Sequence, residues 1–228
     1  MLVFDVISIV LLVVLLFWTV YNGSIIYVGI KSRRKHNSPT NQVGEFPKIS
    51  IIIPTKNEEI VIKRCLDGFL NIDYPQDKID IIVVDGNSTD NTAKICAQYT
   101  TKFQSFQVIT ETQSKGKPAA LNQALPHTTG DIIAVFDADS LPDKDVLQKA
   151  IPYFTDPKVM AIQGRTTSIN ERCNALTRVI AMEEKAWFQA LLNGREKLNL
   201  FVPLNGSCQF VRRKILIDMN GWDENSLT

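Results

Sequence analysis

The sequence predicts an α/β protein with a mostly parallel sheet, helices on both faces of that sheet, and one transmembrane helix in front of it. From residue 48 onward, short apolar runs of strand length alternate with longer helix-like stretches. That order is typical of parallel sheets covered by helices. Residues 6–30 carry no charged side chain. The predicted domains are a transmembrane helix at 1–30, a basic juxtamembrane tether at 31–47 and an α/β domain at 48–228.

The apolar segment at the N-terminus is long enough to cross a membrane. Its 25 uncharged positions reach roughly 37 Å as a helix, against a hydrocarbon core of about 30 Å. A secretory signal peptide is the alternative, but no basic residue precedes the run. Four basic residues follow it within 31–35. By the positive-inside rule, we expect a cell-membrane protein with its N-terminus outside and the rest of the chain in the cytoplasm.

The composition of the chain limits its class. Of 228 residues, 45% are hydrophobic and 21% are charged, which predicts an ordered domain with a full core. The net charge is +1, and without the basic cluster the body is slightly acidic, so no nucleic-acid partner is expected. The four cysteines form no C-x-x-C pair and predict reduced thiols.

The α/β domain divides into elements as follows. Strands are expected at 48–54, 79–85, 107–110, 131–136 and 159–163, and helices at 58–70, 89–100, 117–125 and 143–154. A further helix at 172–193 is expected to pack on the sheet; a position near the membrane, through Trp187, Phe188 and Leu191, is the alternative. In such sheets, ligands bind beyond the carboxyl ends of the strands. No glycine-rich phosphate loop of the dinucleotide or P-loop type is present.

Two carboxylates follow the fourth predicted strand. Asp137 and Asp139 flank Ala138, and alternation in an extended chain would point both the same way, about 7 Å apart. Such a pair suits a hard cation and its oxygen ligands. A solvated loop that caps a helix beginning near Pro142 is the alternative.

Other polar groups are expected at the same edge of the sheet. Asp85 ends the second strand and is a candidate for ligand binding, whereas Ser88–Asp90 are expected to cap the next helix. The segment Lys115–Pro118 opens a helix, where cationic side chains and free N–H groups favour an anion; an ordinary charged turn is the alternative. Trp222 is either a core anchor or an aromatic platform for a sugar ring.

The motifs also form an ordered set. Between residues 49 and 228 the chain contains ISIIIPTKNEE, VVDGNSTDNT, KGKPAALN, DADS, NGS and GWDENSLT in that order. Together they resemble the family 2 inverting glycosyltransferases, in particular the membrane-embedded branch that contains cellulose, chitin and hyaluronan synthases. Each motif alone is common, and the ordered set is specific.

The resemblance implies a nucleotide-diphospho-sugar transferase fold of the GT-A type and metal-dependent sugar transfer with inversion. A nucleotide sugar, with a UDP-sugar favoured, would be the donor, and a saccharide or a lipid the acceptor. Asp139 would bind Mg or Mn, which neutralises the leaving diphosphate. The expected donor-binding residues are Thr55, Glu58, Asp85, Lys117 and Asp137, and the expected acceptor-binding residues are Asn205, Gly206, Trp222 and Asp223.

The general base lies outside this set. In the family it is the final Asp of a Thr-Glu-Asp motif, and Thr228 stands at the Thr of that motif. We therefore expect the base just after Thr228, a C-terminally incomplete domain, and a chain that is inactive by itself. Two alternatives are an inactive, membrane-anchored nucleotide-sugar binding module and a phosphohydrolase of the haloacid dehalogenase type. In the latter, the aspartate pair follows the first strand rather than the fourth.

Overall fold

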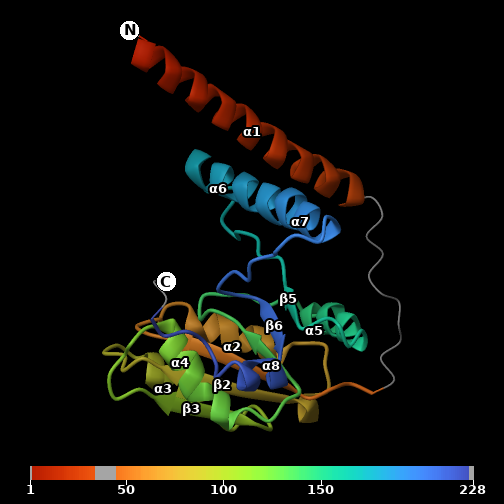
Figure 1. The fold of residues 1–228 in the computed structure, drawn as a ribbon. Coiled ribbons are helices and arrows are strands. Elements are labelled where there is room, and N and C mark those ends of the chain that lie inside the picture. The colour runs from red at the N-terminus through yellow and green to blue at the C-terminus, as the bar shows by residue number, and fades with distance from the viewer. Residues whose placement is uncertain (1, 34–44, 226–228) are drawn as a thin grey trace. The chain divides into compact units, whose positions relative to one another are not determined.

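The computed structural model describes residues 2–33 and 45–225, which fall into two compact units (Figure 1). One unit joins the N-terminal helix to the segment 165–203. The other unit contains the sheet and its helices. The segment 165–203 is therefore an insertion that leaves the sheet unit after Gly164 and re-enters it at Leu204.

The sheet has six strands in the order β3-β2-β1-β4-β6-β5. Their bounds are β1 Ile49–Thr55, β2 Ile79–Asp85, β3 Phe106–Thr110, β4 Ile132–Val135, β5 Ala161–Gln163 and β6 Gln209–Arg212. The pairs among the first four strands are parallel, and β6 is antiparallel to both β4 and β5. This confirms the mostly parallel sheet. The sequence analysis missed β6, because its pairing with β4 and β5 joins residues far apart in the chain.

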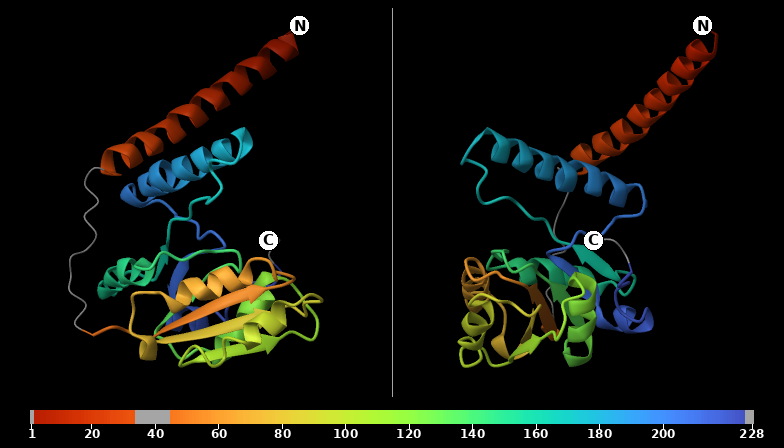
Figure 2. Two further views of the ribbon diagram at one scale, coloured as in Figure 1. Left: turned by 180° about the vertical axis from the view of Figure 1, so that it is seen from behind. Right: turned by 90° about the vertical axis from the view of Figure 1, so that its left-hand side faces the viewer.

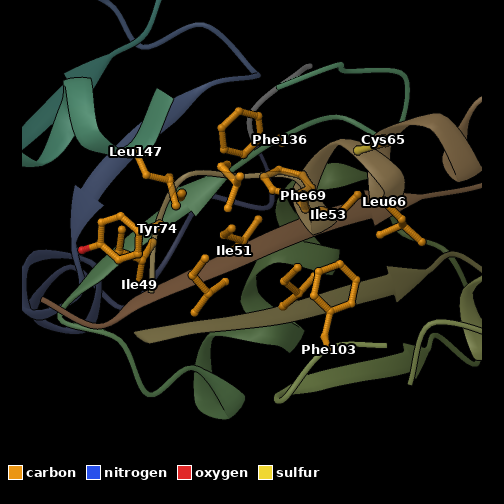
Figure 3. Packing of buried hydrophobic residues seen from close by; sticks show 14 of the residues in the cluster. Ile49, Ile51, Ile53, Cys65, Leu66, Phe69, Tyr74, Phe103, Phe136 and Leu147 are labelled. Carbon is orange, nitrogen blue, oxygen red and sulfur yellow. The ribbon is translucent and has the colours of Figure 1, made fainter. Parts of the chain in front are cut away.

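Helices cover both faces of the sheet, as predicted. Alternation along β1 points Ile51 and Ile53 into one core cluster and Ile52 into another. The first cluster contains residues of α2 (Ile62–Leu70), α3 (Thr92–Ala97) and α5 (Val146–Ala150), and the second contains residues of α4 (Lys117–Ala124) and α8 (Arg213–Asp218). Figure 3 shows the first cluster, in which the rings of Phe69 and Phe136 meet edge to face at 5.1 Å.

The strand order creates a crevice at one point of the sheet. From β1 the chain runs through α2 to β2 on one side, whereas β4 pairs with the opposite edge of β1. Such a reversal leaves space beyond the carboxyl ends of the two central strands, where ligands of open α/β sheets bind. The loops that follow β1, β2 and β4 therefore converge.

The other unit is helical. The helix α1 (Leu2–Arg33) is, by length and composition over 4–32, able to cross a membrane. The inserted segment forms α6 (Ala175–Ala186), a π-helical stretch η4 (Trp187–Leu192) and α7 (Asn193–Lys197). Figure 2 shows η4 and α7 beside the C-terminal part of α1 from further sides.

The helical residues of 172–193 belong to the unit of α1 rather than to the sheet unit. Within that unit, η4 and α7 contact α1, whereas the packing of this helix on the sheet stays a prediction. Gly29 of α1 and Gly194 of α7 allow the two backbones to meet, which any larger side chain would prevent.

Candidate active site

A pocket of about 370 Å³ lies at the carboxyl ends of the central strands. It receives residues from the loops after β1, β2, β3 and β4 and from the start of α4. Its ionisable and hydroxyl-bearing lining residues are Thr55, Lys56, Glu58, Glu111, Ser114, Lys117, Asp137 and Asp139. The structure thus brings together four of the five expected donor-binding residues and the expected metal ligand. The fifth, Asp85, lies between the lining residues Val84 and Gly86.

Two buried polar atoms at the inner end of this region lack a hydrogen-bond partner among the described residues. They are the hydroxyl of Thr55 and one carboxylate oxygen, Oδ1, of Asp85. Thr55 is 6% exposed and Asp85 is 1% exposed. The other oxygen of Asp85 accepts the backbone N–H of Ser88 at 3.2 Å. Burying such groups unpaired costs free energy, so the pair indicates a site built for a polar ligand.

The loops after β1 and β2 are fastened to each other by hydrogen bonds. Asn57 donates its N–H to Ser88 Oγ at 2.9 Å, and its side-chain oxygen accepts the N–H of Thr89 at 2.8 Å. The N–H of Glu58 donates to Thr92 Oγ1 at 2.8 Å. These bonds hold Glu58 at the edge of the pocket.

The N-cap of α3 is Asn91, whose side chain makes no capping bond, so the capping predicted for Ser88–Asp90 is met only in part, by Asp90 one residue earlier. Its carboxylate accepts the N–H of Thr92, the first residue of α3, at 2.9 Å. Ser88 and Thr89 instead bind the loop after β1. The sequence could not distinguish these uses, since both need a short oxygen-bearing side chain.

Lys117 is one of two lysines, with Lys56, that line the pocket. The predicted helix start is confirmed, because α4 begins at Lys117 after Gly116, whose φ of 98° disfavours other residues. The ammonium group of Lys117 donates to Asp137 Oδ1 and to the carbonyl oxygen of Gly206. It therefore links three segments that are far apart in the sequence.

The two aspartates after β4 do not lie in an extended chain. The N–H of Ser140 donates to the carbonyl oxygen of Asp137 at 3.0 Å, which closes a turn over 137–140. The alternation argument for their geometry is therefore wrong, although both side chains line the pocket. The alternative of a cap near Pro142 also fails, because α5 begins only at Val146.

The carboxylates of the pocket suit a divalent cation only if a bound phosphate supplies further oxygen ligands. Among the described residues, no group of three or more His, Cys, Asp or Glu side chains could hold a metal ion. Asp137 is already paired with Lys117, whereas Asp139 is exposed at the rim. A Mg²⁺ or Mn²⁺ ion typically takes one or two protein carboxylates plus substrate phosphates and water. Asp139 fits that role.

Electrostatics at the rim favour a cation. Burial raises the pKa of Glu58 above its ordinary value, and the negative charges of Asp139, Asp90 and Asp137 raise it further. The closeness of these carboxylates gives this part of the pocket a negative potential, which favours a cation.

Glu111 is a pocket residue that the sequence analysis missed. It follows β3 and is 5% exposed, and its N–H donates to the carbonyl oxygen of Asp85 at 2.8 Å. Burial raises the pKa of its carboxyl group, while Lys56 and a hydrogen bond with Ser114 act in the opposite direction. Its position directly after a strand was the available signal, but β3 is short and only partly buried.

The four expected acceptor-binding residues do not line the pocket. Asn205 donates its N–H to Gln163 Oε1 at 2.6 Å, and Gly206 binds Lys117. Trp222 packs against the second core cluster, which agrees with an anchor.

Asn122 of α4 fastens the segment that carries Trp222 and Asp223. Asn122 accepts the N–H of Trp222 at 2.7 Å and donates to its carbonyl oxygen at 2.8 Å. Asp223 is exposed. Their roles toward an acceptor stay predictions, and Thr228 lies outside the described residues.

Comparison with known proteins identifies one family and relatives that are named as glycosyltransferases or sugar-lipid synthases. Residues 50–219 match the family described as glycosyl transferase family 2. The chain is 35% identical to a beta-monoglucosyldiacylglycerol synthase from Nostoc sp. over 205 residues, which are 88% of this chain and 43% of that protein. It is 36% identical over 187 residues to a probable glycosyltransferase, YdaM, from Bacillus subtilis, covering 80% of this chain and 44% of that protein. The chain thus spans less than half the length of these curated relatives.

A solved structure supports the same fold. The mannosyltransferase PcManGT from Pyrobaculum calidifontis, solved with GDP-Man and Mn²⁺, superposes with a TM-score of 0.70 at 26% identity. The match covers 92% of this chain and 58% of that one. The sheet, its strand-end pocket and these relatives agree with a GT-A type fold.

Proposed function

The chain belongs to glycosyl transferase family 2, and from that premise we propose that its pocket binds a nucleotide-diphosphate sugar whose sugar is transferred to a saccharide or lipid acceptor with inversion. The observation that carries this proposal is the pair of unpartnered buried polar atoms on Thr55 and Asp85. A nucleoside presents both donors and acceptors on its base and ribose, so it can satisfy a hydroxyl and a carboxylate side by side.

The diphosphate is proposed to bind beside Lys117. Lys117 supplies a positive charge and stands at the first turn of α4, where the backbone also favours anions. In the absence of ligand, Lys117 is paired with Asp137. The phosphates of a donor compete for that ammonium group, whereas Glu58, which also lines the pocket, is proposed to contact the nucleoside.

Asp139 would hold the divalent cation that accompanies the donor. When bound, Mg²⁺ or Mn²⁺ neutralises the charge that develops on the departing nucleoside diphosphate. Asp137 stays hydrogen-bonded through its backbone N–H to Ser207 Oγ at 3.1 Å, which holds the turn in place. The solved relative with GDP-Man and Mn²⁺ supports this assignment. The preference for a UDP-sugar stays a prediction.

The acceptor hydroxyl attacks the anomeric carbon from the face opposite the diphosphate, and a base removes its proton. The base that the resemblance implies comes after Thr228, beyond the described residues. Asn205, Gly206, Trp222 and Asp223 are proposed to contact the acceptor. The relative that is named for glucosyldiacylglycerol synthesis supports a lipid as one acceptor class.

We further propose that α1 anchors the enzyme in the cell membrane, with its N-terminus outside and the catalytic unit in the cytoplasm. In support, α1 is long and apolar enough to cross a bilayer. Basic residues also cluster at 31–35.

Calorimetric titration of UDP and GDP into the 228-residue chain, with and without Mn²⁺, tests the donor site. We expect saturable binding of one nucleotide, strengthened by Mn²⁺, and loss of that strengthening in Asp139→Ala. The control Asp143→Ala removes a nearby carboxylate that does not line the pocket, and it should bind as the unaltered chain does. Equal binding with and without Mn²⁺ in all three proteins would exclude the metal role. Absence of nucleotide binding would exclude the donor site.

A further inference from the structure

The inserted helix presents an apolar surface that no described residue covers. Along α6 and the first residue of η4, the exposed side chains on one face are almost all apolar. Apart from Glu183, they are Leu176, Val179, Ile180, Met182, Ala186 and Trp187. Leu176 is 68% exposed and Met182 64%. A helix in water seldom leaves such a stripe uncovered.

Further along the same helix, η4 and α7 contact α1. Ala190 of η4 and Gly194 of α7 are buried there, and so are Ile25 and Gly29 of α1. A methyl group on Gly29 would lie 1.8 Å from the carbonyl oxygen of Ala190, and one on Gly194 would lie 2.0 Å from that of Ile25. Backbone contact of this kind, through small residues, is typical of helix pairs in membranes.

The position of Ile25 and Gly29 along α1 indicates how deep in a bilayer the contact with η4 and α7 would lie. A hydrocarbon core of about 30 Å takes about 20 helical residues, which reach Ile25 when counted from Val6, the first residue after the charged Asp5. Gly29 then lies roughly 6 Å beyond the core, among the lipid headgroups. All described side chains of α1 before Asn22 are exposed, in keeping with a lipid surround. From the contact, α1 and α6 diverge in every view (Figures 1 and 2).

We propose that the helix Ala175–Lys197 lies in the membrane–water interface, with its exposed apolar face in contact with lipid. This inference rests on the proposal that α1 spans the membrane. Helices of this type bury their apolar face about 5–10 Å into the boundary between headgroups and acyl chains. The contact with Ile25 and Gly29 holds the helix at that level.

The charges of the inserted segment suit this position. Glu183 lies within the apolar face, and a carboxylate there favours the headgroup level over the hydrocarbon interior. The segment 165–203 carries six basic and four acidic residues, so its net charge complements anionic lipids. Trp187 is partly exposed at 38%, and tryptophan is enriched at this depth of a bilayer.

Quenching of tryptophan fluorescence by brominated lipids tests the proposal, because the chain has three tryptophans in three different settings. Each is left as the single tryptophan by changing the other two to Phe, and each protein is placed in nanodiscs of phosphatidylcholine and phosphatidylglycerol. One set of lipids carries bromine near the carboxyl end of the acyl chain and another near the methyl end. The protein that retains only Trp187 is expected to lose fluorescence, more with the shallow bromines than with the deep ones.

The two other proteins are the controls. Trp18, in α1, is expected to be quenched strongly, whereas Trp222, packed in the sheet unit, is not. If Trp18 is quenched but Trp187 is not, the interfacial helix is refuted while the anchor stands. An unquenched Trp187 with blue-shifted emission would show protein cover by a second copy, which also refutes lipid contact. If Trp18 is itself unquenched, the proposed anchor fails, and the interfacial helix fails with it.

Discussion

Replacing Thr55 by Val should have opposite effects on stability and on nucleotide binding. The change keeps the shape of the side chain and removes a hydroxyl that is buried without a partner. An unpaired buried hydroxyl costs about 1–3 kcal/mol, and Val suits a central strand. We therefore expect the ligand-free chain to gain about 1 kcal/mol of unfolding free energy, near the lower end of that range.

The same substitution should weaken the complex. If the hydroxyl of Thr55 bonds the nucleoside, losing one neutral hydrogen bond costs about 0.5–1.5 kcal/mol, or roughly 2- to 12-fold in Kd. Thr92→Val is the matched control, because Thr92 is also fully buried but its hydroxyl accepts the N–H of Glu58 at 2.8 Å. That variant leaves a partner unpaired and should lose about 1–3 kcal/mol of stability.

Urea unfolding and nucleotide titration measure both effects. With a slope of about 1–3 kcal/mol per molar, a gain of about 1 kcal/mol moves the midpoint upward by roughly 0.3–1 M. A Thr55→Val protein that unfolds at lower urea, as Thr92→Val should, would show that the hydroxyl is satisfied within the protein. Unchanged affinity for nucleotide would show that it does not face the ligand.

Three further predictions concern charge, pH and helix packing. Lys117→Met should weaken binding of a nucleoside diphosphate by about 10- to 150-fold, the cost of one charge-assisted hydrogen bond. Titration with the plain nucleoside, whose affinity should hardly change, checks that the loss lies at the phosphates. Burial raises the pKa of Glu111 above 4.5, so the stability contributed by its neutral form is present below that pH and is lost as the pH rises through the folded pKa. Urea midpoints of Glu111→Gln should therefore exceed those of the unaltered chain at pH 7 and approach them at pH 4. A difference that stays constant with pH would contradict the assignment. Gly29→Leu should separate α1 from α7 at a cost of about 1–3 kcal/mol or more, seen as faster proteolysis within 165–203, whereas Gly23→Leu, where a Cβ meets nothing within 4 Å, should behave as the unaltered chain does.

The sheet was predictable where strands were long and apolar. Strand β2 agrees with its predicted bounds at 79–85, and the start of α4 at Lys117 was recognised from its Gly and Pro neighbours. Strand β6 was missed, because its pairing with β4 and β5 depends on residues far apart in the chain. Pattern reasoning identifies local period and turn chemistry, and it does not identify which distant strand completes a ladder.

The candidate site was predictable as a set of strand-end residues, but its geometry was not. The turn at 137–140 replaces the extended pair assumed from alternation, since strand pairing ends at Val135. Glu111 escaped notice because its burial arises from packing beside Gly86, which no spacing reveals. The sequence also did not show that the helix 172–193 belongs to the unit of α1, because an apolar helix face does not identify the element that packs against it.

Photoaffinity labelling with a UDP analogue that carries an azide on the base tests the central claim most directly. We expect labelled peptides from the loops around Thr55, Gly86 and Glu111, competed by excess UDP, because the unpartnered atoms at the ends of β1 and β2 are assigned to the nucleoside. Specific labelling of the separate surface groove between Lys63 and Lys144, with none at the strand ends, would contradict the account.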